Sequence, residues 1–483
     1  MMARPTQSEF NQRIHNLVRE LRDHIYNGQL LPNDYLPSEL NLGKQYDLSK
    51  ESVRRALDEL VAAGLITKVR RVGNRVNASS MWLSKDHPFW TSGAFRAADA
   101  TTNSFGQKIL RFAYHHSLFK EAALQHLIDS FEQAHPDVHV QMMPTSFPVE
   151  YADRGLADVI SITTWDTMKL RNQADSTGLS HLTSPPCSDA ADPKIYESFL
   201  DPYSIPNERL LAMPFLFSPL VLCYNRTHFS ECGLDVPDDS WTWYTLLNAA
   251  RQLTSRLDVW GFATHIHSIN RWPIFLLQNG FRFRTEKDGQ RPTDDPALWE
   301  GLHIARNLIH KQGRPFSLWT EDNSDAEQLF LEGKASMIIT SYYGLNQLRD
   351  SHLDYAVAPL PTLTNADTLL LATGLSVHRD SPQQELAQLF VHYLCSFEAQ
   401  SHIRRQTLSL PVHSEALALT DGLTGNRPKE EDVYASLWPR CRQYSDLGLN
   451  ASQMEAFRLE LKAYWSRMED EIEVRVRLEE LLR

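Results

Sequence analysis

Basic side chains are the first residues along the chain whose type and spacing point to chemistry. Six cations occupy two neighbouring expected elements: Lys50, Arg54 and Arg55 on a helix, and Arg70, Arg71 and Arg75 on the hairpin that follows it. Cations grouped in this way neutralise nucleic-acid phosphates, and some of them can read base edges. The alternative is a solvated helix face, because Glu51 and Arg55 are spaced to pair with each other.

The helix that carries three of these cations is expected over residues 49 to about 63. Ser49 can cap its first turn, and Glu51 suits the positive end of the helix dipole. Its apolar residues recur at helical spacing and define a buried face: Val53, Leu57, Leu60 and Val61. A shorter helix capped by Ser38 precedes it, and Gly64 separates it from β runs at 65–69 and 75–77.

Helix, turn, helix and basic hairpin are typical of a winged helix-turn-helix, whose second helix enters the DNA major groove. Over about the first 78 residues the sequence resembles GntR-type bacterial transcription regulators. The matching residues are Ile25-Tyr26-Asn27-Gly28, Leu36-Pro37-Ser38-Glu39, Leu48-Ser49-Lys50, Val53-Arg54-Arg55-Ala56-Leu57, Leu60 and Gly64-Leu65-Ile66. The family's usual arginine after the Leu-Pro-Ser-Glu motif is Leu40 here, its Ser-Arg pair is Ser49-Lys50, and its wing tip keeps only Gly73.

The GntR resemblance implies a set of DNA-contacting residues on the two helices and the wing. These are Ser38, Glu39, Ser49, Lys50, Ser52, Arg54, Arg55, Arg70, Arg71, Gly73, Asn74 and Arg75. It also implies that paired heads act on near-palindromic sites, so we expect a homodimer on operator DNA.

Aromatic and polar residues gather at the expected ends of strands and starts of loops in the rest of the chain. Sugar rings present flat C–H faces that stack on aromatic rings, and their hydroxyls need amide, carboxylate, imidazole or guanidinium partners. The candidate ligand residues are Tyr114, His115, Trp165, Asp166, Tyr224, Asn225, Trp260, Asn270, Arg271, Trp272, Tyr342, Tyr343 and Gly374. For any single aromatic the alternative is core packing, and we assign Trp241 and Trp243 to that role.

Strand and helix patterns alternate from Lys108 onward. Strands are expected at 109–114, 138–142 and 157–162, and one helix at 118–134. This alternation predicts an α/β domain with a largely parallel sheet, in which ligands bind beyond the carboxyl ends of the strands. A further helical, charge-rich stretch is expected over 454–482, either covering the body or making a dimer contact.

Residues from about 106 to 483 resemble the solute-binding proteins of ABC sugar importers. The matching segments are Leu211-Ala212-Met213-Pro214-Phe215, Val221-Leu222-Cys223-Tyr224-Asn225-Arg226, Phe330-Leu331-Glu332-Gly333-Lys334-Ala335-Ser336-Met337-Ile338, Thr373-Gly374-Leu375-Ser376-Val377 and Leu410-Pro411-Val412-His413. The resemblance implies two α/β lobes, joined by crossing strands, that close on a ligand. Lobe I is expected over about 106–215 and 370–410, and lobe II over about 216–369 and 411–483.

The expected fold class is therefore multi-domain. A winged helix-turn-helix head, mostly α with a small β wing, occupies residues 1–78 and is followed by a linker at 79–105. The body at 106–483 is expected to be a two-lobe α/β domain of the type II periplasmic-binding-protein kind.

Charge and cysteine usage fit such an arrangement. The net charge of the 483 residues is −12. Residues 1–78 hold 12 Lys and Arg against 9 Asp and Glu, a net charge of +3, which leaves −15 for the remainder. A weakly basic head on an acidic body favours DNA contact by the head alone. The five scattered cysteines favour reduced thiols, and the chain shows no secretory signal and no apolar run of spanning length. We therefore expect a cytoplasmic protein without a membrane partner.

Metal and catalytic signatures are missing from the sequence. His115-His116 and the pair His265 and His267 have no Cys or carboxylate partner at metal-ligand spacing. No nucleophile elbow, phosphate-binding loop or dinucleotide fingerprint occurs. We expect neither a metal nor a cofactor, and no enzymatic activity.

The leading hypothesis is a one-component transcription regulator whose body binds a mono- or oligosaccharide and modulates DNA binding by the head. One alternative is a DNA-binding head fused to an aminotransferase-like enzyme body. Another is a solute-binding module with a degenerate head, for which Leu40 and the thinned wing tip are the support.

Overall fold

The structure is a computed structural model, and it describes most of the body and part of the head. The described residues of the head are 13, 17–18, 21, 36–37, 42–43, 46, 48–62, 65–69 and 73–76. Those of the rest are 102–103, 106–172, 182–183, 203–205, 209–283, 291–311 and 323–482. The chain divides into two compact units, one formed by Met1–His116 with Pro136–Ala157 and the other by Ser117–His135 with Asp158–Arg483.

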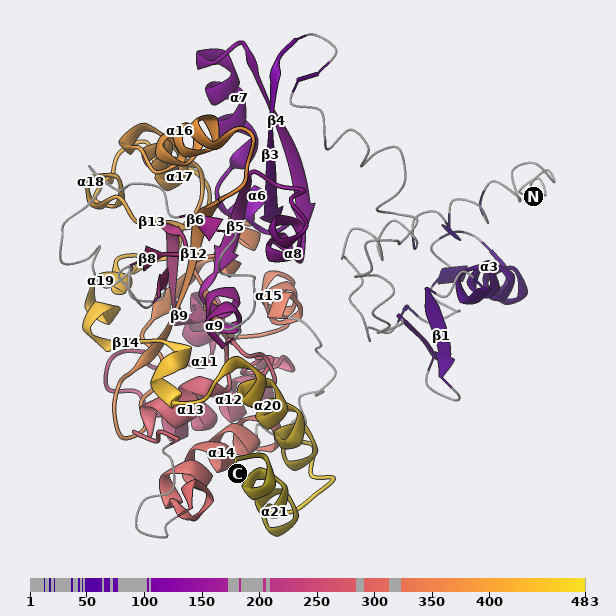
Figure 1. Cartoon of the computed structure of the whole chain (residues 1–483). Helices are drawn as coiled ribbons and strands as arrows, with labels where there is room; N and C mark the ends of the chain where they lie inside the picture. Colours follow the sequence, from indigo (N-terminus) through magenta and orange to yellow (C-terminus); the bar gives the residue numbers. More distant parts are fainter. Residues whose placement is uncertain are drawn as a thin grey trace, which may run out of the picture. The chain divides into compact units, whose positions relative to one another are not determined.

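In the head, the elements with described bounds are helix α3 and the hairpin that follows it (Figure 1). Helix α3 (Lys50–Ala62) confirms the predicted second helix. Strands β1 (Ile66–Val69) and β2 (Gly73–Val76) pair antiparallel, with Ile66 opposite Val76. The second strand begins at Gly73, two residues earlier than predicted, because the backbone pairing with Val69 continues past the apolar residues. Buried residues from along the head form its core: Leu17, Val18, Leu21, Leu36, Leu42, Leu48, Val53, Ala56, Leu57, Leu60, Leu65, Ile66 and Val76.

The rest of the first unit is built on two parallel strands. Strand β3 (Lys108–His115) pairs with β4 (Val138–Thr145) in register from one end to the other. Helix α8 (Pro148–Asp153) contacts β3, and the Arg111 guanidinium donates to the carbonyl of Gly155 over 3.1 Å. The strand at 109–114 was predicted correctly, and both strands extend further than their apolar cores.

Two long strands run side by side through the second unit (Figure 1). They are β9 (Met213–Asn225) and β12 (Thr368–His378), and every residue of both is buried. Strand β12 pairs antiparallel with β5 (Val159–Thr163) and with the first half of β9. The second half of β9 pairs antiparallel with β10 (Met337–Ser341) and β11 (Tyr355–Ala358).

Short strands complete the pairing. Strands β6 (Leu182–Thr183) and β14 (Cys441–Arg442) pair with β12, β13 (Leu410–Pro411) pairs with β9, and β7 (Ser204–Ile205) pairs with β8 (Arg209–Leu210). The prediction of a largely parallel sheet is wrong for this unit, because β9 and β12 run in opposite directions. Alternating strand and helix patterns favour parallel pairing without requiring it, because a strand that follows a long connection can also return in the opposite direction.

Helices gather at both ends of these strands (Figure 1). Those beside β10 and the last half of β9 are α11 (Arg226–Cys232), α12 (Trp243–Leu257), α13 (Pro273–Gln278), α14 (Pro296–His310), α15 (Asn323–Leu331), α20 (Ala451–Trp465) and α21 (Glu471–Leu482). The others are α6 (Leu118–Glu121), α7 (Leu124–Ala134), α9 (Thr164–Asn172), α16 (Gln384–Leu394), α17 (Phe397–Gln406), α18 (Ser414–Leu417) and α19 (Val433–Leu437). In the described part of the chain, none of the helices combines the length and apolar character needed to cross a bilayer.

Two predicted helices are each divided in two. The helix expected over 118–134 breaks at Ala123, whose φ is 48°, and the stretch expected over 454–482 breaks at Arg467, whose φ is 59°. A positive φ at a residue other than glycine is set by tertiary packing rather than by helical periodicity. Helices α20 and α21 contribute Met454, Phe457 and Val474 to the main core of the body, so this stretch covers the body.

Gly261 allows a very close backbone contact in the body. A Cβ at this position would lie 2.0 Å from the carbonyl oxygen of Ala250 on α12. We expect Gly261→Ala to lower the free energy of unfolding by about 3 kcal/mol, because backbone atoms must move apart. Gly333→Ala is the matched control, since its Cβ would meet nothing within 4 Å and only its φ of +67° is strained. Equal losses in denaturant titrations of the two variants would contradict this explanation.

Candidate functional site

The start of α3 presents cations to solvent while its opposite side is buried. The Ser49 hydroxyl caps the helix, accepting from the amide of Ser52 over 3.2 Å, as predicted. Lys50, Arg54 and Arg55 are exposed, whereas Val53, Ala56, Leu57 and Leu60 are buried. Ser52 is also buried and bonds the Ser49 hydroxyl at 2.7 Å, so its side chain supports the cap.

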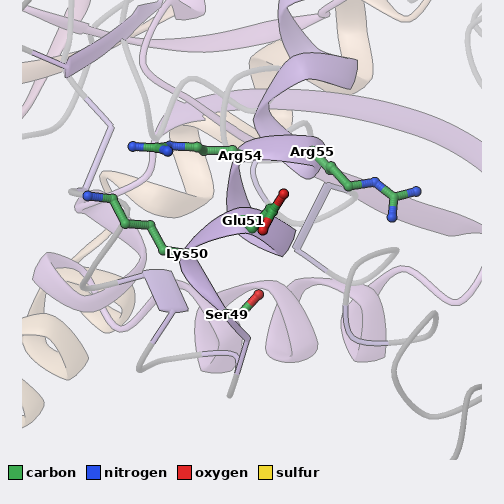
Figure 2. Close-up of a pocket in the computed structure, with 5 residues that line it drawn as sticks. All are labelled: Ser49, Lys50, Glu51, Arg54 and Arg55. Carbon is green, nitrogen blue, oxygen red and sulfur yellow. The ribbon is translucent and has the colours of Figure 1, made fainter.

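An open hollow of about 670 Å³ lies at this helix start, lined by Ser49, Lys50, Glu51, Arg54 and Arg55. Figure 2 shows Lys50 and Arg54 extending to one side, Arg55 to the other and Glu51 between them. Three cations against one carboxylate, at a helix N-terminus, form an electropositive surface suited to phosphate oxygens.

Three of the predicted wing residues lie in the described part of the hairpin: Gly73, Asn74 and Arg75. Asn74 is buried, and its carbonyl accepts from the Leu36 amide over 2.8 Å, which joins the hairpin to an earlier segment. Arg75 is half-buried opposite Thr67, and Gly73 begins the second strand. The other predicted DNA contacts lie outside the described residues: Ser38, Glu39, Arg70 and Arg71.

In the body, Trp165 contacts Tyr444, which comes from a distant segment and is bonded in turn to Asn270. Its ring lies edge-on to that of Tyr444, with centroids 5.4 Å apart. The Tyr444 hydroxyl donates to the side-chain oxygen of Asn270 over 2.5 Å. Trp165 and Asn270 are partly exposed and Tyr444 is buried. The structure therefore brings together two predicted ligand residues and one that was not predicted.

A second group of side chains lies around Tyr203, which is fully buried. Burial raises the pKa of its hydroxyl well above the usual range, with further contributions from nearby Tyr343 and Asp166. Among the described residues this hydroxyl has no hydrogen-bond partner. Gly374 leaves the space that Tyr203 needs, since a Cβ there would lie 3.1 Å from the Tyr203 ring.

A buried ion pair supports the polar residues of this region. The Arg271 guanidinium lies 3.8 Å from the Glu327 carboxylate, and both side chains are 3% exposed. The Thr340 hydroxyl donates to the same carboxylate oxygen over 2.7 Å. Arg271 and Asp166 also act on Tyr444, whose pKa is raised by burial, lowered by the guanidinium and raised by the carboxylate. These charges thus lie close to the Trp165–Tyr444 pair.

Asp166 and Glu121 bring negative charge to the same region. Asp166 accepts from the amide and the hydroxyl of Thr163, over 3.1 and 2.7 Å, and so caps α9. Glu121 lies close enough to the Tyr343 hydroxyl to raise its pKa, after the larger effect of burial. We call the whole set the aromatic–polar cluster: Glu121, Trp165, Asp166, Tyr203, Asn270, Arg271, Tyr343, Gly374 and Tyr444.

The other predicted ligand residues lie elsewhere in the structure. Trp260 forms a β-bridge with Ala335 just before β10, and Tyr224 pairs with Met337, the first residue of β10. Trp260 and Tyr224 therefore lie at the end of β10 that is far from Tyr343. The Asn225 side chain caps α11, accepting from the His228 amide over 3.1 Å. Trp272 is fully buried against Phe457, with ring centroids 5.4 Å apart.

Three further candidates complete this placement. Tyr342 is fully buried and its hydroxyl donates to the Glu431 carbonyl over 2.7 Å. Tyr114 and His115 end β3 in the first unit, where the His115 ring stacks on His116 with centroids 4.5 Å apart. Among the described residues no group of three or more His, Cys, Asp or Glu is arranged to hold a metal ion.

Sequence reasoning missed Glu121, Tyr203 and Tyr444. Tyr203 lies where apolar periodicity fails, so no pattern points to it. Tyr444 had one available signal, the Gln443 and Asp446 spacing, which forms a capping box around the short helix η7 (Tyr444–Leu447).

Glu121 makes part of the stability of the body dependent on pH. Burial raises the pKa of its carboxyl to about 7, against a smaller opposing effect of a hydrogen bond from Ser117. The folded state therefore holds this proton at pH values where the unfolded state has lost it, and the stabilisation disappears as pH rises from about 4.5 to about 7. The free energy of unfolding of Glu121→Gln, minus that of the wild type, should therefore be larger at pH 8 than at pH 5 by up to about 3 kcal/mol.

Denaturant unfolding at both pH values measures this difference. Glu415→Gln is the control, because Glu415 is exposed. Parallel pH profiles for wild type and Glu121→Gln would show that Glu121 titrates alike in the folded and unfolded states.

Comparison with known proteins gives two matches along the chain. Residues 14–76 match the family of bacterial regulatory proteins of the gntR family, and residues 116–401 match the bacterial extracellular solute-binding protein family. The curated relatives include the sn-glycerol-3-phosphate-binding periplasmic protein UgpB of Brucella abortus, 26% identical over 226 residues. That alignment covers 44% of this chain and 51% of the relative, so the chain spans about half the length of the curated relatives it matches.

Solved structures share the fold of the body. One is the GacH receptor of Streptomyces glaucescens, solved unliganded and with acarbose, with a TM-score of 0.65 and 18% identity over 77% of this chain and 98% of that one. Another is a substrate-binding protein of Listeria monocytogenes in complex with cycloalternan, with a TM-score of 0.63 and 19% identity over 77% and 97%. The chain belongs to the bacterial extracellular solute-binding protein family and carries a gntR-family domain ahead of that body.

Proposed function

We propose that this protein is a ligand-responsive, one-component transcription regulator. Its winged helix-turn-helix head binds operator DNA, and its body binds a mono- or oligosaccharide between two lobes. The observation that carries the proposal is the presence of a gntR-family domain and a solute-binding body in one chain. Both matched families bind rather than transform their ligands, which favours a regulator over an aminotransferase-like enzyme.

The exposed cations of α3 support DNA binding. A recognition helix needs a buried apolar side to dock on its domain and a polar side to enter the groove. Helix α3 has both, with Leu57 and Leu60 in the head core and Arg54 and Arg55 in solvent. The exposure of Lys50, Arg54 and Arg55 also disfavours the alternative of a degenerate head.

The aromatic–polar cluster supports a carbohydrate ligand. Trp165 supplies a partly exposed indole for a sugar face, and Asn270 and Asp166, which are also partly exposed, supply partners for sugar hydroxyls. The names of the solved relatives cite cycloalternan, acarbose and maltose as their ligands. A sugar phosphate would depend on Lys169, whose ammonium lies 5.6 Å from the centre of the Trp165 ring, because Arg271 is already paired with Glu327.

Regulation requires that the sugar prefer one arrangement of the body and that this arrangement change how the heads engage DNA. Only the difference in affinity between arrangements can shift DNA binding. Helix-turn-helix heads read paired half-sites, so we propose a homodimer. We also propose a cytoplasmic location, because operator DNA is found there.

Thermal unfolding of the full-length protein against a panel of mono- and oligosaccharides tests the proposal. A sugar that binds only the folded body, at about 100 times its dissociation constant, adds about 2.7 kcal/mol of stability. The same sugar should then change retention of operator DNA in a mobility-shift assay. A panel without any shift would overturn the carbohydrate assignment, and a shift without any effect on DNA would overturn the regulatory coupling.

A further inference from the structure

Residues 419–431, between α18 and α19, lie outside the sheet and contact both α17 and the edge of β11. We call this segment the brace. It contains no helix, and its one β-bridge pairs Lys429 with Ala356 of β11. Gly425 lets the brace approach closely, since its φ is +83° and a Cβ there would lie 2.5 Å from the Arg349 side chain.

One side of the brace holds the end of α17. The Thr424 amide and hydroxyl donate to the Arg405 carbonyl over 2.9 and 2.8 Å. The Arg427 guanidinium donates to the carbonyls of Arg404 and Thr407 over 2.7 and 2.6 Å. A cation is well placed there, because the last carbonyls of a helix carry partial negative charge.

The other side of the brace holds the end of the sheet that carries β10 and β11. The Asn426 amide donates to the Arg349 carbonyl over 2.6 Å, and the Tyr355 hydroxyl donates to the Asn426 carbonyl over 2.8 Å. Backbone bonds of 2.9 and 3.1 Å connect Lys429 with Tyr355 and Val357. The brace is therefore bonded along its length to both α17 and the β11 edge.

A buried group of three charges fixes the end of the brace. The Glu431 carboxylate accepts from Arg404 over 2.5 Å and from Arg427 over 2.7 Å, and these side chains are 3–12% exposed. A carboxylate between two guanidiniums leaves no buried negative charge unpaired, so the geometry of all three is strongly constrained. Glu431 thus ties α17 to the brace.

Tyr342 links this group to the aromatic–polar cluster. Its hydroxyl donates to the backbone carbonyl of Glu431, and the next residue is Tyr343 of the cluster. We infer that the brace holds α17 and the β10 end of the body in the arrangement that assembles the cluster, with Tyr342 and Glu431 as positioning residues. This inference rests on the proposed ligand site and adds a control of its affinity by residues that do not touch ligand.

Tyr342→Phe in the full-length, unliganded protein tests the inference by hydrogen–deuterium exchange. The variant keeps the ring contact with Tyr434, at 5.9 Å, and removes only the hydroxyl. We expect about five-fold faster exchange at the amide of Asp446, which lies beside Tyr444 and far from Tyr342 in sequence. With maltose as the probe, the apparent Kd should rise by a similar factor, because a smaller fraction of the protein is competent to bind.

Two further variants make the result decisive. Tyr464→Phe, at a buried tyrosine of α20, is the matched control and should leave the Asp446 amide unchanged. Glu431→Gln should change exchange in the same direction as Tyr342→Phe and by a larger factor, because it weakens both guanidinium contacts.

Acceleration confined to residues adjoining Tyr342 and Glu431 would overturn the inference and leave the brace a local structural element. Exchange is measured without sugar or DNA, so its outcome is separate from that of the proposed function. If exchange at Asp446 changes and no sugar binds, the brace stands and the carbohydrate proposal falls.

Discussion

Replacing Arg54 and Arg55 together with alanine is expected to weaken binding of the full-length protein to its operator by about 100-fold at physiological salt. Both side chains are exposed at the start of α3, on the side opposite the core of the head. Binding with fewer phosphate contacts releases fewer counterions from the DNA. The plot of log affinity against log salt concentration should therefore also become shallower, by about two units for the pair.

Fluorescence anisotropy over a range of salt concentrations measures both effects. The DNA is a fragment selected from random sequence by the wild-type protein, which avoids assuming an operator. Lys120→Ala is the control, because it removes an exposed cation of the body. An unchanged salt dependence in the double variant would mean that α3 does not contact phosphates. Loss of affinity for the selected sequence alone, with affinity for unrelated DNA retained, would instead assign the two arginines to base edges.

Replacing Trp165 with alanine should weaken sugar binding by about 100-fold, the largest effect expected at any single position of the body. Its indole is a partly exposed ring of the aromatic–polar cluster and lies edge-on to Tyr444. Removing it takes away both the stacking surface and a neighbour that orders Tyr444. Isothermal titration with the sugar identified by thermal unfolding measures the change.

Trp438→Ala is a closely matched control for this loss. Trp438 is also partly exposed and makes a similar edge contact, with Phe217 at 5.8 Å, but it does not belong to the cluster. Both variants should lose comparable stability, whereas only Trp165→Ala should lose affinity. Equal losses of affinity would place the ligand elsewhere or assign Trp165 to the core.

Local chemistry made helix α3 and several strands of the body predictable. The Ser49 cap and the spacing of Val53, Leu57 and Leu60 depend on neighbouring residues alone, and α3 forms as expected. The same holds for the apolar runs that became β3 and β5. Trp165 and Asp166 were placed at a strand end from sequence, and the structure shows them in the first turn of α9.

Tertiary contacts decided what the sequence patterns did not reveal. The break at Ala123 and the antiparallel direction of β12 depend on packing between distant segments. Tyr203 and Tyr444 join Trp165 from segments without periodic patterns, so no local rule selects them. Asn225 and Trp272 were chosen for their residue type, which does not distinguish a helix cap or a core ring from a ligand contact.

The late position of Tyr444 in the chain has a genetic consequence. A premature stop codon after residue 440 leaves the coding region of the head intact, yet it removes Tyr444 together with the buried residues of α20 and α21. Such truncation alleles are expected to encode proteins that keep the head but lose the proposed ligand response, because the main core of the body is incomplete. Selections for mutants that no longer respond to the ligand should therefore recover nonsense and frameshift mutations at the 3′ end of the gene as readily as missense changes at Trp165.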